Sequence, residues 1–165
     1  MKRFACTSLV LFALIISGTP AGLAQKPLFS AADTQELLSF RLTDDMVEHY
    51  RSATMAFAAW GKAHPKDVDK DDDDKSASDV SISDMVAHFT KHPQFEIVMR
   101  SNGITPRQYI DTMFVLTTGL IMVDMQKEGQ AIKPSPILSA ANLDYIRKNH
   151  DHLEKIAKEM GESGE

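Results

Sequence analysis

The chain has 165 residues, of which 43% are hydrophobic and 25% are charged, and its formal net charge at pH 7 is −5. This length suits one modest hydrophobic core. The negative charge argues against a nucleic-acid-binding protein, which presents a basic face, and against an anionic membrane surface as a partner.

The first 24 residues follow the order of an export signal. A basic segment, Met1 to Arg3, precedes an apolar run from Ala5 to Ser17. The small residues Gly22 and Ala24 occupy the two positions that a signal peptidase recognises. We predict cleavage after Ala24 and a periplasmic or secreted mature protein with no stable membrane anchor. A single membrane-spanning anchor is the alternative, which the short apolar run disfavours.

Cleavage at this position also removes the only cysteine, Cys6, and the basic residues Lys2 and Arg3. The formal charge then changes from −5 to −7. A mature chain without cysteine has no disulfide, no cysteine-ligated metal and no covalently attached c-type haem.

The remaining sequence divides into a lead-in segment at 25–41, a single helical domain at 42–161 and a tail at 162–165. We expect at most a short helical turn at 30–38. No stretch of useful length alternates apolar and polar residues as a strand does. The predicted fold class is all-α, an irregular bundle of four or five helices around a central buried helix.

The first clear helix is predicted to begin after Thr43, whose side chain suits an N-cap. Gly61 and Pro65 indicate where this helix ends. Its apolar residues recur every three or four positions, as on a face that packs against another helix. That face consists of Met46, Tyr50, Ala53, Phe57 and Trp60.

Residues 66–79 are dominated by aspartate and lysine, so we expect a solvated, flexible acidic loop. Three aspartates of this loop match the first three ligands of a calcium-binding EF-hand. Asp72 stands where the EF-hand requires glycine, and Ser78 stands where it requires glutamate. We therefore expect divalent ions to bind this loop only weakly.

The same loop contains Asp-Asp-Asp-Asp-Lys at 71–75, the sequence that enteropeptidase recognises. We expect this protease to cut the folded protein after Lys75, because exposed polar loops are preferred sites of proteolysis. The two fragments should stay associated, since the helices on either side share one core. Native gel filtration after digestion measures both results, and resistance to the protease would show that the segment is ordered or covered.

The central helix is predicted to run from Thr105 to Glu128, with Gly129 as its stop. Thr105 can cap it, and Gln108 can complete a capping box. Upstream, Ser81 to Asp84 reads as another capping box, and His92-Pro93 predicts a break between two shorter helices. The apolar residues of the central helix cover most of its circumference, so it should be buried on several sides.

After a proline-containing connector, the last helix is predicted to start near Ser139. Its apolar stripe consists of Leu143, Ile146, His150, Leu153, Ala157 and Met160. A histidine on such a stripe needs a hydrogen-bond partner to offset the loss of water. The candidate partners on the central helix are Asp111, Thr117, Thr118 and Asp124.

His150 has two interpretations. In the first it is a buried, neutral core histidine that donates one hydrogen bond. In the second it is a cofactor-binding residue that holds haem with Met46, as histidine and methionine do in b-type cytochromes. Core methionine and histidine are far commoner than haem ligands, so we expect no cofactor.

His88 and His92 lie four residues apart on one predicted helix and are the candidate metal ligands, because such a pair can chelate zinc or copper. The sequence lacks the glutamate of an H-E-x-x-H motif and marks no third ligand. The alternative is that His92 flanks the helix break and His88 is solvated.

Nothing in the sequence matches a catalytic motif such as a nucleophile elbow or a glycine-rich phosphate loop. We therefore expect an exported protein that binds a small ligand or a protein partner without catalysis. The alternative is a periplasmic haem-binding or metal-binding helical bundle. An enzyme would need a deep polar cleft with a perturbed histidine.

Several short segments together resemble a group of small exported bacterial proteins that are all helical and have no assigned function. They are Leu42-Thr43-Asp44-Asp45-Met46, His92-Pro93, Gly103-Ile104-Thr105-Pro106-Arg107-Gln108-Tyr109 and Asn142-Leu143-Asp144-Tyr145-Ile146 with His150. The resemblance implies the helical fold and export, and it implies no activity.

Overall fold

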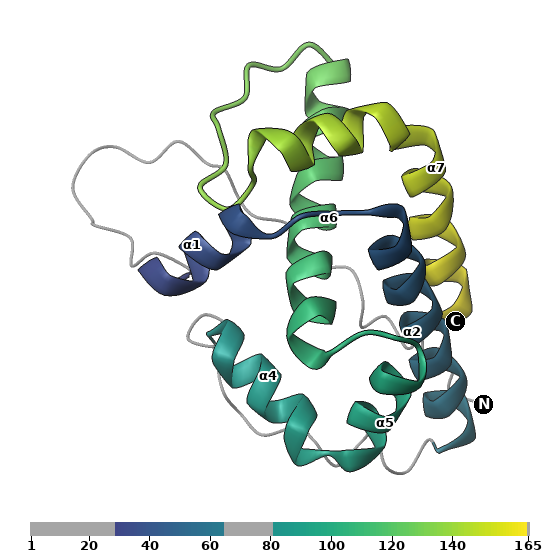
Figure 1. The fold of residues 1–165 in the computed structure, drawn as a ribbon. Helices are drawn as coiled ribbons and strands as arrows, with labels where there is room; N and C mark the ends of the chain where they lie inside the picture. The colour runs from purple at the N-terminus through teal and green to yellow at the C-terminus, as the bar shows by residue number, and fades with distance from the viewer. Residues whose placement is uncertain (1–28, 65–80, 165) are drawn as a thin grey trace, which may run out of the picture.

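The computed structural model describes residues 29–64 and 81–164, and these two ranges contain six helices and no strand (Figure 1). The helices are α1 (Ala31–Ser39), α2 (Asp44–Ala63), α4 (Ile82–Lys91), α5 (Pro93–Ser101), α6 (Pro106–Lys127) and α7 (Ala140–Gly164). The predicted all-α class is confirmed. The predicted signal peptide and acidic loop lie outside the described residues. Among the helices of the described ranges, none has the length and apolar character needed to cross a membrane.

Side chains at the helix starts explain where three of the helices begin. The Thr43 hydroxyl accepts the amide of Met46 at 3.2 Å. Ser81 forms a reciprocal capping box with Asp84, and Thr105 forms one with Gln108. Each cap satisfies amides that the first turn of a helix leaves without a carbonyl partner. The predicted caps are therefore confirmed.

The break between α4 and α5 falls at His92 and Pro93, as predicted. His92 has φ −110° and ψ 89°, outside the helical region, and it ends α4 while Pro93 begins α5. Proline excludes helical angles at the preceding residue but suits the first helical position itself. The two short helices can therefore follow the surface of α6 at different angles.

Helix α6 is the centre of the fold, because α2, α4, α5 and α7 all pack against it. Figure 1 shows α7 crossing the C-terminal half of α6 and then turning to run beside α2. Gly129, just after α6, has a φ of +77°, which glycine adopts without strain. The buried residues of α6 are Pro106, Ile110, Asp111, Thr112, Val115, Leu116, Gly119, Met122 and Val123.

Helices α6 and α7 approach closely at Gly119, where a Cβ atom would overlap Cδ1 of the fully buried Ile146. Gly119→Ala should lower the free energy of unfolding by about 1 kcal/mol, because overpacking costs about 1–3 kcal/mol and exceeds the gain of about 1 kcal/mol in helix propensity. In an Ile146→Val background, which lacks Cδ1, the same change should no longer destabilise. Urea unfolding of the four proteins measures this, and equal losses in both backgrounds would contradict the close approach.

The lead-in segment is more ordered than expected, since it contains α1. The Ser30 hydroxyl caps this helix by accepting the Asp33 amide at 3.0 Å. Leu37 is fully buried, and Phe29 packs edge-on against Phe114 of α6 with ring centroids 5.1 Å apart. The expected tail at 162–165 is also helical as far as Gly164, where the Ser163 hydroxyl donates back to the carbonyl of Glu159. The short helical turn expected at 30–38 is therefore present as α1, whereas the helical continuation to Gly164 was not expected.

A buried asparagine ties the segment between α1 and α2 to the start of α7. Asn142 is 1% exposed. Its side-chain oxygen accepts the Leu42 amide at 3.0 Å, and its side-chain nitrogen donates to the Phe40 carbonyl at 2.9 Å. One side chain thus satisfies two backbone groups about 100 residues away in sequence. The connection between α1 and α2 is held by this clamp rather than by secondary structure.

Candidate functional site

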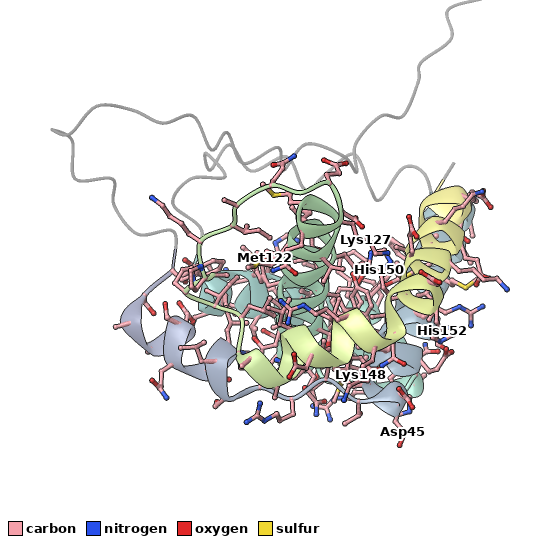
Figure 2. The ribbon with its side chains drawn as sticks, turned by 90° about the horizontal axis from the view of Figure 1, so that it is seen from above. Asp45, Met122, Lys127, Lys148, His150 and His152 are labelled. Atoms are coloured by element: carbon pink, nitrogen blue, oxygen red, sulfur yellow. The ribbon has the colours of Figure 1, made fainter. Side chains whose placement is uncertain are left out.

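His150 lies near the middle of α7 and reaches the C-terminal end of α6 (Figure 2). The residue is 4% exposed. Its Nε2 atom lies 2.7 Å from Oδ1 of Asp124, and its Nδ1 atom lies 2.7 Å from Nζ of Lys127. Both ring nitrogens therefore have charged partners on α6.

These contacts assign the donor and acceptor roles of the two ring nitrogens of His150. The ammonium group of Lys127 can only donate, so Nδ1 of His150 must accept. The ring proton is then on Nε2, which donates to the Asp124 carboxylate. His150 is thus a buried imidazole with a partner at each ring nitrogen, and Asp124 is the partner among the four candidates on the central helix. Asp111, another candidate, instead contacts Arg107.

An open hollow of about 410 Å³ lies over this pair of helices. Most of its lining is charged or polar, and it consists of Lys127, Arg147, Lys148, Asn149, His150, Asp151 and His152. Figure 2 shows Lys127 next to His150, while Lys148 and His152, two residues before and two residues after His150 on α7, lie farther from Lys127. His150 is the buried member of this lining. The hollow therefore combines exposed charged side chains with the buried imidazole of His150.

Replacing His150 with leucine should lower the melting temperature without unfolding the protein. The change removes the hydrogen bonds of the buried ring, and because Asp124 and Lys127 are about half exposed and can turn to water, a loss of about 1 kcal/mol is expected. Leucine limits the cavity because its volume is similar. Thermal melts measure the loss, and absorbance spectra should show no Soret band in either protein. A Soret band in the wild type that the variant lacks would overturn the structural interpretation.

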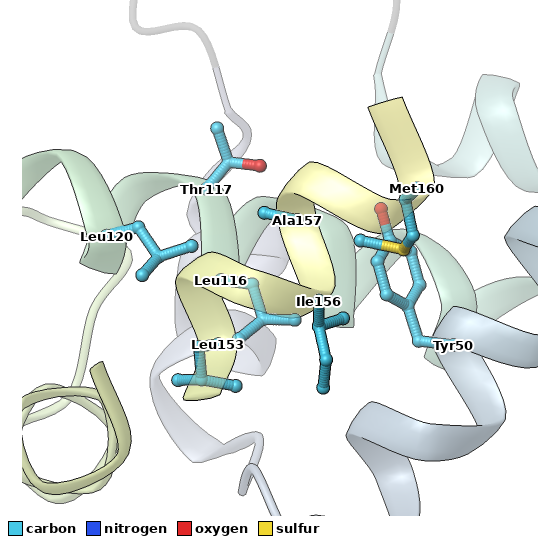
Figure 3. A pocket seen from close by; sticks show the side chains of 8 residues that line it. All are labelled: Tyr50, Leu116, Thr117, Leu120, Leu153, Ile156, Ala157 and Met160. Carbon is cyan, nitrogen blue, oxygen red and sulfur yellow. The ribbon is translucent and has the colours of Figure 1, made fainter. Parts of the chain in front are cut away.

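The second cofactor candidate, Met46, lies half-buried in the first turn of α2 and packs against the core. An apolar crevice of about 50 Å³ opens nearby between α2, α6 and α7 (Figure 3). Pockets for cofactors usually measure about 300–1,000 Å³. The crevice is lined by Tyr50, Leu116, Thr117, Leu120, Leu153, Ile156, Ala157 and Met160.

The metal candidates His88 and His92 lie side by side, with ring centroids 4.8 Å apart. Each ring also contacts an aromatic neighbour, Phe89 for His88 and Phe95 for His92. Within the described ranges, no third carboxylate or histidine joins them closely enough to make a three-ligand group. Their role as metal ligands stays a prediction.

The group of three potential ligands that the described residues do form is His150, Asp151 and Glu154. Their ligand atoms all lie within 4.8 Å of one another. Our sequence analysis missed this group because Asp151 and Glu154 read as ordinary exposed residues of a helix. The available signal was that Asp151 and Glu154 follow His150, a histidine of the apolar stripe, by one and four residues.

A second buried charge cluster joins α1 to α6. Nε of Arg107 lies 3.2 Å from both carboxylate oxygens of Asp111, and Nη2 lies 2.6 Å from Glu36 and 3.6 Å from Asp33. Burial raises the pKa of Asp111, Arg107 counteracts this, and the neighbouring carboxylates Glu36 and Asp33 add to the rise. One arginine thus serves three carboxylates, and the cluster holds α1 in place.

Comparison with known proteins identified no family, curated protein or solved structure that matches the chain.

Proposed function

We propose that this protein is an exported, non-catalytic binding protein whose small, charged ligand occupies the hollow between the end of α6 and the middle of α7. The observation that carries the proposal is the buried imidazole of His150 in that hollow. Asp124 and Lys127 hold the ring from two sides, so its orientation is set before a ligand arrives. Preorganised polar groups lower the free-energy cost of ordering on binding.

The size and lining of the available spaces favour an ion or a small charged molecule. The apolar crevice of about 50 Å³ is well below the usual volume for a cofactor such as haem. The hollow over His150 is larger, about 410 Å³, and most of its lining is charged or polar. The alternative function is a haem-binding or metal-binding bundle. Of these two ligands, the size and lining of the spaces favour the metal ion over haem.

A role without catalysis is supported by where three of the raised pKa values lie. Burial raises the pKa of Tyr50 and Tyr109, and it raises the pKa of Asp111. The rings of Tyr50 and Tyr109 pack at 4.8 Å with a tilt of 42° between α2 and α6, and Asp111 belongs to the cluster that holds α1. Tyr50 also lines the small apolar crevice, but none of the three lines the polar hollow over His150, and catalytic groups with shifted pKa values cluster in such clefts.

Export is supported by the basic start, apolar run and small residues of the first 24 positions. The absence of cysteine after position 24 suits any redox compartment. Helices α2, α4, α5 and α7 pack against α6, and this all-helical fold supports the expectation from the resemblance. The protein should therefore meet its ligand in the periplasm or outside the cell.

Nuclear magnetic resonance of ¹⁵N-labelled histidine tests the proposal. We would titrate the protein with ZnCl₂ and, separately, with inorganic phosphate, and follow the ring nitrogens of each histidine. At least one of the two probes should shift the His150 ring in a saturable manner, while His88 and His92 stay unchanged. His150 resonances that respond to neither probe would contradict a ligand site at this hollow.

A further inference from the structure

The three ligand atoms of His150, Asp151 and Glu154 lie within 4.8 Å of one another, close to the spacing of ligands around a tetrahedral metal ion. Nδ1 of His150 lies 3.5 Å from Oδ1 of Asp151 and 3.8 Å from Oε2 of Glu154. Metal–ligand bonds of about 2.0–2.1 Å place tetrahedral ligands about 3.3–3.4 Å apart. The observed distances are slightly longer, and both carboxylates belong to exposed side chains that can adjust. Small rotamer changes would therefore complete the geometry.

The second nitrogen of His150 has the partner that metal-binding histidines usually have. A histidine ligand typically donates its other ring N–H to a carboxylate, which fixes the tautomer and raises the basicity of the ligand. Here Nε2 donates to Asp124 at 2.7 Å, and Nδ1 is the ring nitrogen that lies near the carboxylates of Asp151 and Glu154. This hydrogen bond comes from α6 and is independent of the acidic residues on α7.

A cation already lies beside two of these three ligands, His150 and Asp151. Nζ of Lys127 lies 2.7 Å from Nδ1 of His150 and 3.8 Å from Oδ1 of Asp151. The ammonium therefore lies where the lone pair and the carboxylate both favour positive charge. The Lys127 side chain is 54% exposed, so it can leave for solvent when another cation enters.

We propose that His150, Asp151 and Glu154 bind a divalent transition-metal ion such as Zn²⁺, and that the ion displaces the ammonium group of Lys127. The proposal rests on the proposed function and names the ligand class of the same hollow. Histidine nitrogen with two carboxylate oxygens is a donor set that zinc accepts, and a fourth position stays open for water. Lys127 lowers the affinity by competing for Nδ1, so the site releases its ion more readily than a closed structural zinc site.

Zinc titration of the full chain by calorimetry, with four variants, tests this proposal. The wild type should bind one Zn²⁺. Asp151→Asn with Glu154→Gln should weaken binding by at least the roughly 10–100-fold that loss of a second-shell partner costs. Lys127→Met should do the opposite and tighten binding by about threefold or more, because it removes a competing positive charge. Both changes affect exposed side chains, so the fold should be unaffected.

Two controls separate this site from other histidines. His152→Ala removes an exposed neighbour, and His88→Ala with His92→Ala removes the other histidine pair; both variants should bind zinc like the wild type. Loss of binding in the His88 and His92 variant, or no stoichiometric zinc in the wild type, would overturn the proposal. Weaker binding by Lys127→Met would overturn the displacement of the ammonium.

The histidine resonances distinguish a failure of this proposal from a failure of the proposed function. If phosphate shifts the His150 ring and zinc does not, the metal is wrong and the ligand site stands. If neither probe shifts it, both proposals fall.

Discussion

Arg107→Met is expected to lower the free energy of unfolding by about 3 kcal/mol at neutral pH, the low end of the cost of breaking a buried ion pair. Arg107 is the cation that faces Asp33, Glu36 and Asp111. Asp33 and Asp111 are 4% and 3% exposed, so without Arg107 their charges would be buried and uncompensated. Glu36 is half exposed and can turn to water, which is why the low end is expected.

The loss should shrink as the pH falls. The pKa of Asp111 is raised by burial and held back by Arg107, so removing Arg107 should raise it further. A carboxyl whose folded pKa exceeds its unfolded value of about 3.9 takes up protons preferentially in the folded state. Acidification through that window therefore stabilises the folded state, and it stabilises the variant more than the wild type.

Urea unfolding at pH 7 and pH 4.5 measures both effects. Arg51→Met is the matched control, because Arg51 pairs with Glu159 and Glu48 at the surface and its loss should matter little. Equal losses for the two arginine variants, or a loss at Arg107 that does not change with pH, would contradict a buried charge cluster.

Local sequence signals predicted the helix boundaries well, because a cap is decided within four residues. Thr105 and Gln108 form the expected capping box, and Pro93 separates α4 from α5 as expected. The same signals could not find α1 as a packed helix. Its position depends on contacts with Arg107 and Phe114, which lie 71 residues after Glu36 and 85 residues after Phe29, and no local pattern contains that information.

The candidate site was predicted in part. The stripe of α7 showed that His150 would be buried and would need a partner, and Asp124 is that partner. Lys127 was not foreseen, since a lysine at the end of a helix is ordinarily a solvated charge. Whether His150 can form a metal-binding group with Asp151 and Glu154 depends on which of its ring nitrogens faces them. That orientation follows only from the contacts of His150 with α6.

Asn142→Leu should lower the free energy of unfolding by about 2–4 kcal/mol, because it leaves two backbone groups without partners at about 1–3 kcal/mol each. The Leu42 amide is buried and loses its acceptor, and the half-buried Phe40 carbonyl loses its donor. Since the Leu42 amide loses its hydrogen-bond acceptor in this variant, hydrogen exchange at that amide should also accelerate.

Two variants show which part of the loss comes from the clamp. Asn142→Asp keeps an acceptor for the Leu42 amide but has no N–H for the Phe40 carbonyl, so exchange at Leu42 should stay slow while stability still falls. Asn149→Leu is the matched control on the same helix, because Asn149 donates only to the Tyr145 carbonyl one turn earlier. That carbonyl belongs to the helical hydrogen-bond pattern, so its loss should cost little. Thermal melts and amide exchange of the three variants measure these outcomes. Equal destabilisation by Asn142→Leu and Asn149→Leu, with unchanged exchange at Leu42, would show that the clamp contributes nothing beyond an ordinary helix asparagine.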